Sequence, residues 1–239
     1  ALSAGDLDVY VDYSGTLWTN VLNRSDTPPR SEMIVGVTEW MREKGNVVVL
    51  GALGFENGYG FVMRRDRAEE DGIRTIQGLA ASAPSLTFGV DHEFLARPEW
   101  RKVRDTYNLS FRESRTYDPT LMYRALENGD ADVISGFSSD GRIAAMDLVV
   151  LEDPKGALPG YDALLLVPKA RERDKELLAA LRPLVNAIGI DDMRAANYMV
   201  DRAVNKSTPA EAAKILESKA PIALKYRLRT FSVTSAWAP

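Results

Sequence analysis

A nine-residue stretch that occurs twice decides how this chain folds. Residues 1–9 read ALSAGDLDV, and residues 125–133 read ALENGDADV, so six of the nine positions are identical at an offset of 124 residues. At the same offset an aromatic residue follows, because Tyr13 aligns with Phe137. A helix end followed by Gly-Asp and a strand is also a common αβ junction, but a match of this length at a fixed offset favours an internal repeat. The sequence therefore predicts two similar lobes.

More predicted structure precedes the second copy of the repeat than the first. A strand, a helix, an extended segment and a helix from Asp118 to Asn128 lead into the second copy, whereas the first copy begins at the end of its helix. By analogy, we expect the first lobe to lack its first β-α-β unit. A sheet edge and face left open in this way need cover from a longer chain, a partner or the tail.

Short apolar runs alternate with amphipathic helices along the rest of the chain. Residues 47–50 read VVVL and residues 163–167 read ALLLV, which is typical of strands buried on both faces. Capping residues, prolines and glycines delimit the helices, which we expect at 31–44, 98–108, 118–128, 172–186, 191–201 and 209–218. This alternation predicts an α/β fold with mostly parallel sheets. The tail, residues 222–239, has no clear period and is left unassigned.

The composition of the 239 residues excludes several classes of function. With no Cys and a single histidine, His92, the chain has neither a nucleophilic thiol nor a His cluster for a metal ion. A formal net charge of -4 argues against sequence-independent binding to nucleic acid. The acidic residues stand without a nucleophile or a phosphate-binding loop, so we expect no catalytic residues. The chain is therefore predicted to be non-enzymatic, with no cofactor and no metal.

Four motifs resemble a known family. They are DVYVDYSGT at 8–16, GFENGY at 54–59, SSDGRI at 138–143, and LEDPK at 151–155 followed by PGY at 159–161. In this order and spacing, residues 1 to about 218 resemble the osmoprotectant-binding proteins of ABC importers, which are of the glycine betaine, choline and carnitine type. The tail lies outside the resemblance.

The resemblance implies a periplasmic-binding-protein type II fold, in which two α/β lobes joined by two interlobe crossovers close over a ligand. Lobe 1 would comprise residues 1–64 plus 162–239, lacking its first β-α-β unit, and lobe 2 would comprise residues 65–161. A periplasmic location, or an extracellular one with a membrane anchor, is implied as well.

The resemblance also implies the binding site. A cage of aromatic rings would surround the trimethylammonium group of a ligand, and its members would be Tyr13, Tyr59, Phe137 and Tyr161. The carboxylate side of the ligand would be held by Thr16 and Arg97. In two respects the sequence departs from the family. Phe137 stands where the family commonly has Tyr, and the N-terminal stretch that usually supplies a Lys to the carboxylate is not part of this sequence.

Elementary chemistry supports such a cage. A quaternary ammonium group cannot donate a hydrogen bond, so a protein selects it through cation–π attraction and apolar enclosure, worth about 0.5–2 kcal/mol per ring. A carboxylate needs a charge-assisted donor, and the guanidinium fork of an arginine suits it. With one cationic partner absent, we expect ligands with an anionic tail to lose more affinity than choline.

Each of these residues also has an ordinary structural role open to it. Tyr59 and Tyr161 follow glycine-containing turns and could pack at the edge of a lobe, and Phe137 could belong to the core. Arg97 could be a surface charge at a helix start, and Thr16 could cap a turn.

The sequence thus favours the solute-binding component of an ABC importer that captures a quaternary-ammonium compatible solute, such as glycine betaine or choline. Its partners would be that small molecule and the permease subunits in the membrane, with no nucleic acid. Three alternatives stay open: a ligand-sensing regulatory domain of the same fold, a binding protein for another small osmolyte and, least favoured, an enzyme built on this fold.

Overall fold

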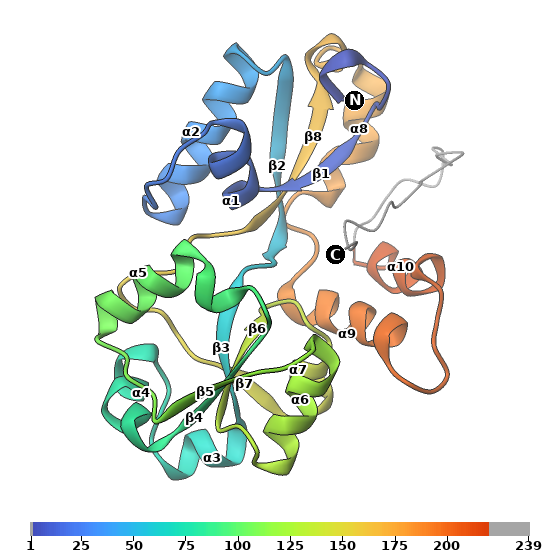
Figure 1. The fold of residues 1–239 in the computed structure, drawn as a ribbon. Coiled ribbons are helices and arrows are strands. Elements are labelled where there is room, and N and C mark those ends of the chain that lie inside the picture. Colours follow the sequence, from blue (N-terminus) through green and yellow to red (C-terminus); the bar gives the residue numbers. More distant parts are fainter. Residues whose placement is uncertain (1, 220–239) are drawn as a thin grey trace.

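The computed structural model describes residues 2–219, which form two lobes joined by two chain crossings (Figure 1). Lobe 1 has a three-stranded sheet with the order β1-β8-β2, and lobe 2 has a five-stranded sheet with the order β5-β4-β6-β3-β7. Helices flank both sheets. The predicted two-lobed α/β architecture is therefore confirmed.

Lobe 1 surrounds a strand that is buried on both faces. Its strands are β1 (Tyr10–Tyr13), β2 (Val47–Glu56) and β8 (Asp162–Pro168). Its helices are α1 (Ser14–Thr16), which continues as a π-helix (Leu17–Val21), α2 (Arg30–Glu43) and α8 (Lys175–Leu181). Met33 and Val37 of α2 pack in one cluster on the sheet and Leu181 of α8 packs in another. Every residue of β8 is therefore buried, as its apolar run predicts.

Lobe 2 is built around an aromatic core. Its strands are β3 (Tyr59–Arg64), β4 (Thr87–Val90), β5 (Glu113–Thr116), β6 (Val133–Phe137) and β7 (Leu148–Val150). Its helices are α3 (Arg65–Glu70), α4 (Ile76–Ser82), α5 (Pro98–Tyr107), α6 (Pro119–Asn128) and α7 (Arg142–Ala145). Phe61 and Phe88 stack with ring centroids 5.2 Å apart, and Trp100 of α5 lies 5.3 Å from Phe88. These rings fix α5 against the sheet.

The strands are mostly antiparallel, which corrects the prediction of mostly parallel sheets. Among the described strands, β4 is parallel to β5 and β6, and the other four pairings are antiparallel. The reason lies in the crossings, because β3 and β8 each enter their sheet from the other lobe and run against their neighbours. The apolar runs indicate burial on both faces, which does not fix the direction of a strand.

The first crossing lies between β2 and β3, at residues 57–58. The sequence places residues 59–64 in lobe 1, but these residues are β3, and β3 pairs with β6 and β7 of the five-stranded sheet. The strand belongs to lobe 2 because its hydrogen bonds are made there. The second crossing leads from β7 to β8, which begins at Asp162.

The helices after β8 touch both lobes. Helix α9 (Ile190–Asp201) lies against α7 of lobe 2 (Figure 1). A Cβ atom on Gly141 would lie 2.3 Å from the backbone nitrogen of Tyr198, so the contact requires glycine there. Helix α10 (Pro209–Glu217) begins with the predicted capping box of Thr208 and Glu211. The tail that the sequence leaves unassigned, residues 222–239, lies outside the described residues.

The repeated stretch forms the same local structure in both lobes. The N–H group of Gly5 donates to the carbonyl of Leu2 at 3.1 Å, and that of Gly129 donates to Leu126 at 3.3 Å. The two glycines have φ angles of 83° and 79°, in the left-handed region that favours glycine. A strand follows each turn, β1 in lobe 1 and β6 in lobe 2. The repeat read from the sequence is therefore a structural repeat.

A serine at the end of each of these strands holds one crossing. The Ser14 hydroxyl donates to the carbonyl of Gly160 and accepts from the N–H of Asp162, both at 2.9 Å. The Ser138 hydroxyl donates to the carbonyl of Glu56 at 3.1 Å and accepts from the N–H of Gly58 at 3.2 Å. Both crossings are thus fixed from the same position of the repeat.

Candidate functional site

Aromatic side chains gather where the two lobes meet. Tyr59, the first residue of β3, lies opposite Phe137, the last residue of β6, and their ring centroids are 4.6 Å apart. The ring of Phe94, which lies in a short 3₁₀ turn after β4 (Phe94–Ala96), is 4.7 Å from the ring of Tyr59. Strand pairing therefore brings together residues 59 and 137, which are far apart in the sequence.

The hydroxyl of Tyr59 is held by Asp91. It donates to Oδ2 of Asp91 at 3.2 Å, while Oδ1 accepts from the N–H groups of Glu93 and Phe94, both at 2.8 Å. Burial and the neighbouring Asp91 carboxylate raise the pKa of Tyr59 to about 12. Tyr59 thus keeps its proton at neutral pH and presents a neutral ring of fixed orientation.

A cation of the chain already lies over this ring. The guanidinium carbon of Arg97 is 5.3 Å from the centroid of the Tyr59 ring, which is within cation–π range. Arg97 is the N-cap residue of α5, and its Nη2 lies 3.7 Å from the carboxylate of Glu93. Burial alone would lower the pKa of Arg97, but Tyr59 and Glu99 outweigh it, so the pKa stays above its ordinary value. The face of Tyr59 is therefore an environment that accepts a positive charge.

Tyr161 connects the second crossing to α5. Its hydroxyl donates to Oε1 of Glu99 at 2.9 Å, and a Cβ atom on Gly15 would lie only 2.7 Å from its ring. Burial, followed by the charge of Glu99, raises the pKa of Tyr161 well above its ordinary value. Tyr161 thus packs on α1 of lobe 1 while it is hydrogen-bonded to lobe 2.

Tyr13 and Thr16 lie on the lobe 1 side. Tyr13 ends β1 and is half-buried. Burial and the charge of Asp12 raise the pKa of Tyr13, and the side chain of Asn57 at the first crossing acts in the opposite direction. The amide oxygen of Asn57 accepts from the hydroxyl of Ser139 at 2.7 Å. Thr16 ends α1, next to the glycine on which the Tyr161 ring packs, and is half-buried. Lobe 1 therefore presents one tyrosine and one hydroxyl at the junction.

The predicted site residues meet to different degrees. Tyr59, Phe137 and Arg97 are brought together directly, whereas Tyr161 is connected through Glu99 and Tyr13 through Asn57. Within residues 2–219, neither Tyr13 nor Tyr161 stacks on another ring, so the four rings do not form a closed cage in this structure.

Four residues at the junction were not expected from the sequence. Three of them contact a tyrosine of the predicted site: Asp91 and Glu99 through their carboxylates and Phe94 through its ring. The fourth is Asn57, whose side chain lies at the first crossing. A weak signal exists for the first three, because they lie in one segment with Arg97, directly after a strand. Strand ends are the usual place for binding residues in α/β proteins.

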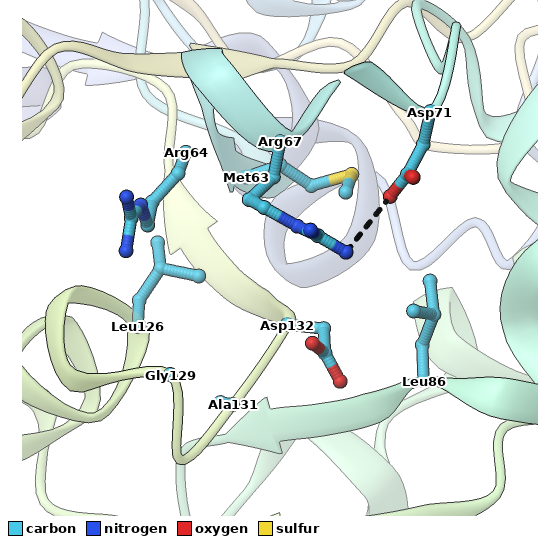
Figure 2. Close-up of a pocket in the computed structure, with 9 residues that line it drawn as sticks. All are labelled: Met63, Arg64, Arg67, Asp71, Leu86, Leu126, Gly129, Ala131 and Asp132. Carbon is cyan, nitrogen blue, oxygen red and sulfur yellow. Dashed lines mark hydrogen bonds and ion pairs between the residues drawn. The ribbon is translucent and has the colours of Figure 1, made fainter. Parts of the chain in front are cut away.

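Two cavities lie away from the aromatic cluster. One, of about 220 Å³, is lined by the far end of β3 and the start of β6 (Figure 2). Its charged side chains are satisfied within the protein: Arg67 pairs with Asp71 at 3.4 Å, and Asp132 accepts from the N–H of Thr87 at 2.7 Å. The other, of about 800 Å³, is a groove on lobe 1 beside β1 and α2. Neither contains a residue of the predicted site.

Residues 2–219 contain no group of three or more His, Cys, Asp or Glu side chains that could hold a metal ion. None of the helices in this range is long and apolar enough to span a membrane.

Two α/β lobes, two crossings and a polar and aromatic junction between them define a periplasmic-binding-protein type II fold. The family model described as the substrate binding domain of ABC-type glycine betaine transport systems matches residues 1–216. The chain therefore belongs to this family, as the resemblance of its motifs predicts. At the level of the family these are substrate-binding proteins of transporters and not enzymes.

The names of similar proteins mention four ligands: ergothioneine, carnitine, glycine betaine and choline. The chain is 30% identical over 216 residues to the ergothioneine transport permease/ergothioneine binding protein EgtU of Helicobacter pylori (strain G27), and the match covers 90% of this chain and 38% of that protein. It is 28% identical over 205 residues to the carnitine transport binding protein OpuCC of Listeria monocytogenes, with coverage of 84% and 67%. A solved structure titled as a glycine betaine/carnitine/choline ABC transporter superposes with a TM-score of 0.85 at 28% identity, over 92% of this chain and 81% of that one. The chain thus spans well under half of the first of these relatives.

Proposed function

We propose that this chain captures a small quaternary-ammonium solute at the junction between its lobes and presents it to the permease subunits of an ABC importer. The observation that carries the proposal is the guanidinium of Arg97, which lies 5.3 Å above the ring of Tyr59. A ring that already holds a cation, with Phe94 and Phe137 beside it, offers a trimethylammonium group the same attraction.

The ligand would replace Arg97 on the ring of Tyr59. A trimethylammonium group is attracted to the ring without needing a hydrogen-bond acceptor, and the displaced guanidinium becomes free to bind a carboxylate. A zwitterion such as a betaine supplies both groups at once. Arg97 thus loses one partner and gains a stronger one.

The lobe 1 side of the site would complete the enclosure. Tyr13 and Thr16 belong to lobe 1, and the ring of Tyr161 packs against Gly15 of α1 in the same lobe. Only when the lobes close do both sets of side chains meet one ligand, so a ligand that touches both stabilises the closed form. The transporter would then recognise the closed shape.

The chemistry shared by the relatives' ligands supports this substrate class. Ergothioneine, carnitine and glycine betaine combine a trimethylammonium group with a carboxylate, whereas choline has the trimethylammonium group alone. We infer that the natural ligand has both groups, and that the protein works outside the cytoplasmic membrane, in the periplasm or as an anchored extracellular protein, where an importer collects its solute.

Isothermal titration calorimetry against glycine betaine, choline and carnitine tests the proposal. At least one of these compounds should bind, and Tyr59→Ala should weaken the best of them about tenfold or more, because a desolvated cation–π contact is worth roughly 2 kcal/mol.

Tyr10→Ala is the matched control, because Tyr10 is an exposed tyrosine of β1 and not part of the predicted site. The Tyr10→Ala variant should bind the same compound with the affinity of the wild-type protein. The proposal is wrong if none of the three compounds binds, or if Tyr59→Ala retains full affinity.

A further inference from the structure

Two buried polar atoms at the start of α5 have no hydrogen-bond partner within the protein. They are Nε of Arg97 and Oε2 of Glu99, and each exposes essentially no surface. One is a donor and the other an acceptor, and their residues stand on either side of Pro98. Burying a polar group without a partner is costly, so native structures keep few such atoms.

The contacts of Glu99 show that it belongs to the junction. Its other oxygen, Oε1, accepts from the hydroxyl of Tyr161 at 2.9 Å, which fixes the carboxylate between α5 and the second crossing. On the other side of Pro98, the guanidinium of Arg97 lies over the ring of Tyr59. The two residues that carry the unpaired donor and acceptor therefore each contact one tyrosine of the predicted cage.

Neighbouring groups do not satisfy Oε2. The hydroxyl of Tyr59 donates to Asp91, and that of Tyr161 donates to Oε1. Among the described residues the carboxylate forms no ion pair with Arg97, whose Nη2 lies nearest to the carboxylate of Glu93. A carboxylate oxygen is an acceptor only, so the missing partner must be an O–H or N–H donor.

We infer that Glu99 is a specificity-determining residue that accepts a hydrogen bond from a hydroxyl or N–H group of the ligand. This inference rests on the proposed function, since it places the ligand's cation on Tyr59 and its carboxylate on Arg97. A trimethylammonium carboxylate with an additional donor satisfies both unpaired atoms, whereas glycine betaine has no donor and leaves Glu99 unsatisfied. The site therefore prefers hydroxylated or ring N–H-bearing betaines.

A matched pair of ligands tests the inference. Carnitine and γ-butyrobetaine have the same trimethylammonium group, chain length and carboxylate, and differ only in the hydroxyl. The wild-type protein should bind carnitine about 10- to 100-fold more tightly by calorimetry, since a hydrogen bond to a charged group has this value. Glu99→Leu should bind both ligands equally, with the affinity for γ-butyrobetaine largely retained.

The exposed carboxylate next to Arg97 provides the control. Glu93→Leu removes a negative charge at a similar place in the sequence and should leave the ratio of the two affinities unchanged. If the negative charge of Glu99 rather than its acceptor were recognised, Glu99→Leu would weaken both ligands equally and keep the ratio, which contradicts the inference.

The outcomes separate this inference from the proposed function. If the wild-type protein binds both ligands with equal affinity, the role of Glu99 is wrong while the proposed function stands. If it binds neither of them and no other quaternary ammonium compound, both are wrong. The comparison of the two ligands on the wild-type protein needs no variant. The inference can therefore be contradicted even if Glu99→Leu does not fold.

Discussion

The turn and strand that open lobe 1 and their counterparts in lobe 2 have the same local structure but different surroundings. Tyr10 and Val11 of β1 are 39% and 38% exposed, whereas Ile134 and Ser135, at the equivalent places of β6, are 0% and 1% exposed. Strand β6 is paired on both sides, by β3 and β4, and β1 pairs with β8 alone among the described strands. Local sequence thus sets the turn and the strand, and neighbouring elements set the burial.

The two copies of the repeat also differ in the contacts that they make at the junction between the lobes. The ring of Phe137 lies 4.6 Å from that of Tyr59 in the aromatic cluster, whereas its counterpart Tyr13 is not in ring contact with this cluster among the described residues. Ser14 and Ser138, one residue further on, still make equivalent pairs of hydrogen bonds to the crossings. The two copies of the repeat therefore share the serine that holds a crossing, and they differ in the contacts of the aromatic residue that would meet the ligand.

The largest effect is expected from the strands of the repeat. Ile134→Ala should lower the free energy of unfolding by about 2–5 kcal/mol, because it leaves a cavity in a packed core. Tyr10→Ala, at the equivalent place of the exposed strand, should cost about 1 kcal/mol or less. Urea unfolding of the two variants measures the difference. Equal losses in the free energy of unfolding would show that β1 is as well packed as β6, which would contradict the difference between the two strands.

The serines at the crossings should show a smaller and more even effect. Ser14→Ala and Ser138→Ala each leave a backbone donor and acceptor without their partner, at a cost of roughly 1–3 kcal/mol. Ser14 is fully buried and Ser138 is half-buried, so the loss for Ser14→Ala should be the larger one. Thermal unfolding of both variants tests this order. A negligible loss at either position would mean that its crossing is not held by the serine.

The smallest effect concerns tyrosine ionisation at the two sides of the junction. The pKa of Tyr59 is raised to about 12 in the folded protein, so its contribution to stability is complete below pH 10 and is lost between about pH 10 and 12. The pKa of Tyr13 is also raised, first by burial and then by Asp12, but by less. Tyr59→Phe should therefore flatten the alkaline loss of stability more than Tyr13→Phe does. Urea unfolding across this pH range measures both slopes, and identical slopes would contradict the difference.

The sequence could predict the parts of the fold that depend on local chemistry. Gly5 and Gly129 mark the two turns, the capping box of Thr208 starts α10, and the run of β8 indicates its burial. The direction of the strands could not be predicted. Two strands, β3 and β8, enter their sheets from the opposite lobe, and the sequence pattern does not show where the chain passes from one lobe to the other.

Part of the candidate site could be predicted from the family resemblance. Tyr59, Phe137 and Arg97 follow from the family resemblance, and the structure brings them into contact. Asp91 and Glu99 were missed because their roles depend on tyrosines that are distant in the sequence, Tyr59 for one and Tyr161 for the other. Their place in one segment after a strand is a weak signal for a site, but their tyrosine partners depend on how this segment packs against the crossings.

The central claim is that the ring of Tyr59 and its neighbours bind a positive charge and not merely an apolar shape. The most direct test is calorimetry with the tightest-binding of glycine betaine, choline and carnitine, and with its neutral isostere, in which a tert-butyl group replaces the trimethylammonium group. We predict that the isostere binds about tenfold more weakly or worse, since the cation–π attraction is lost while the size is kept. Equal affinity of the two compounds would contradict the account.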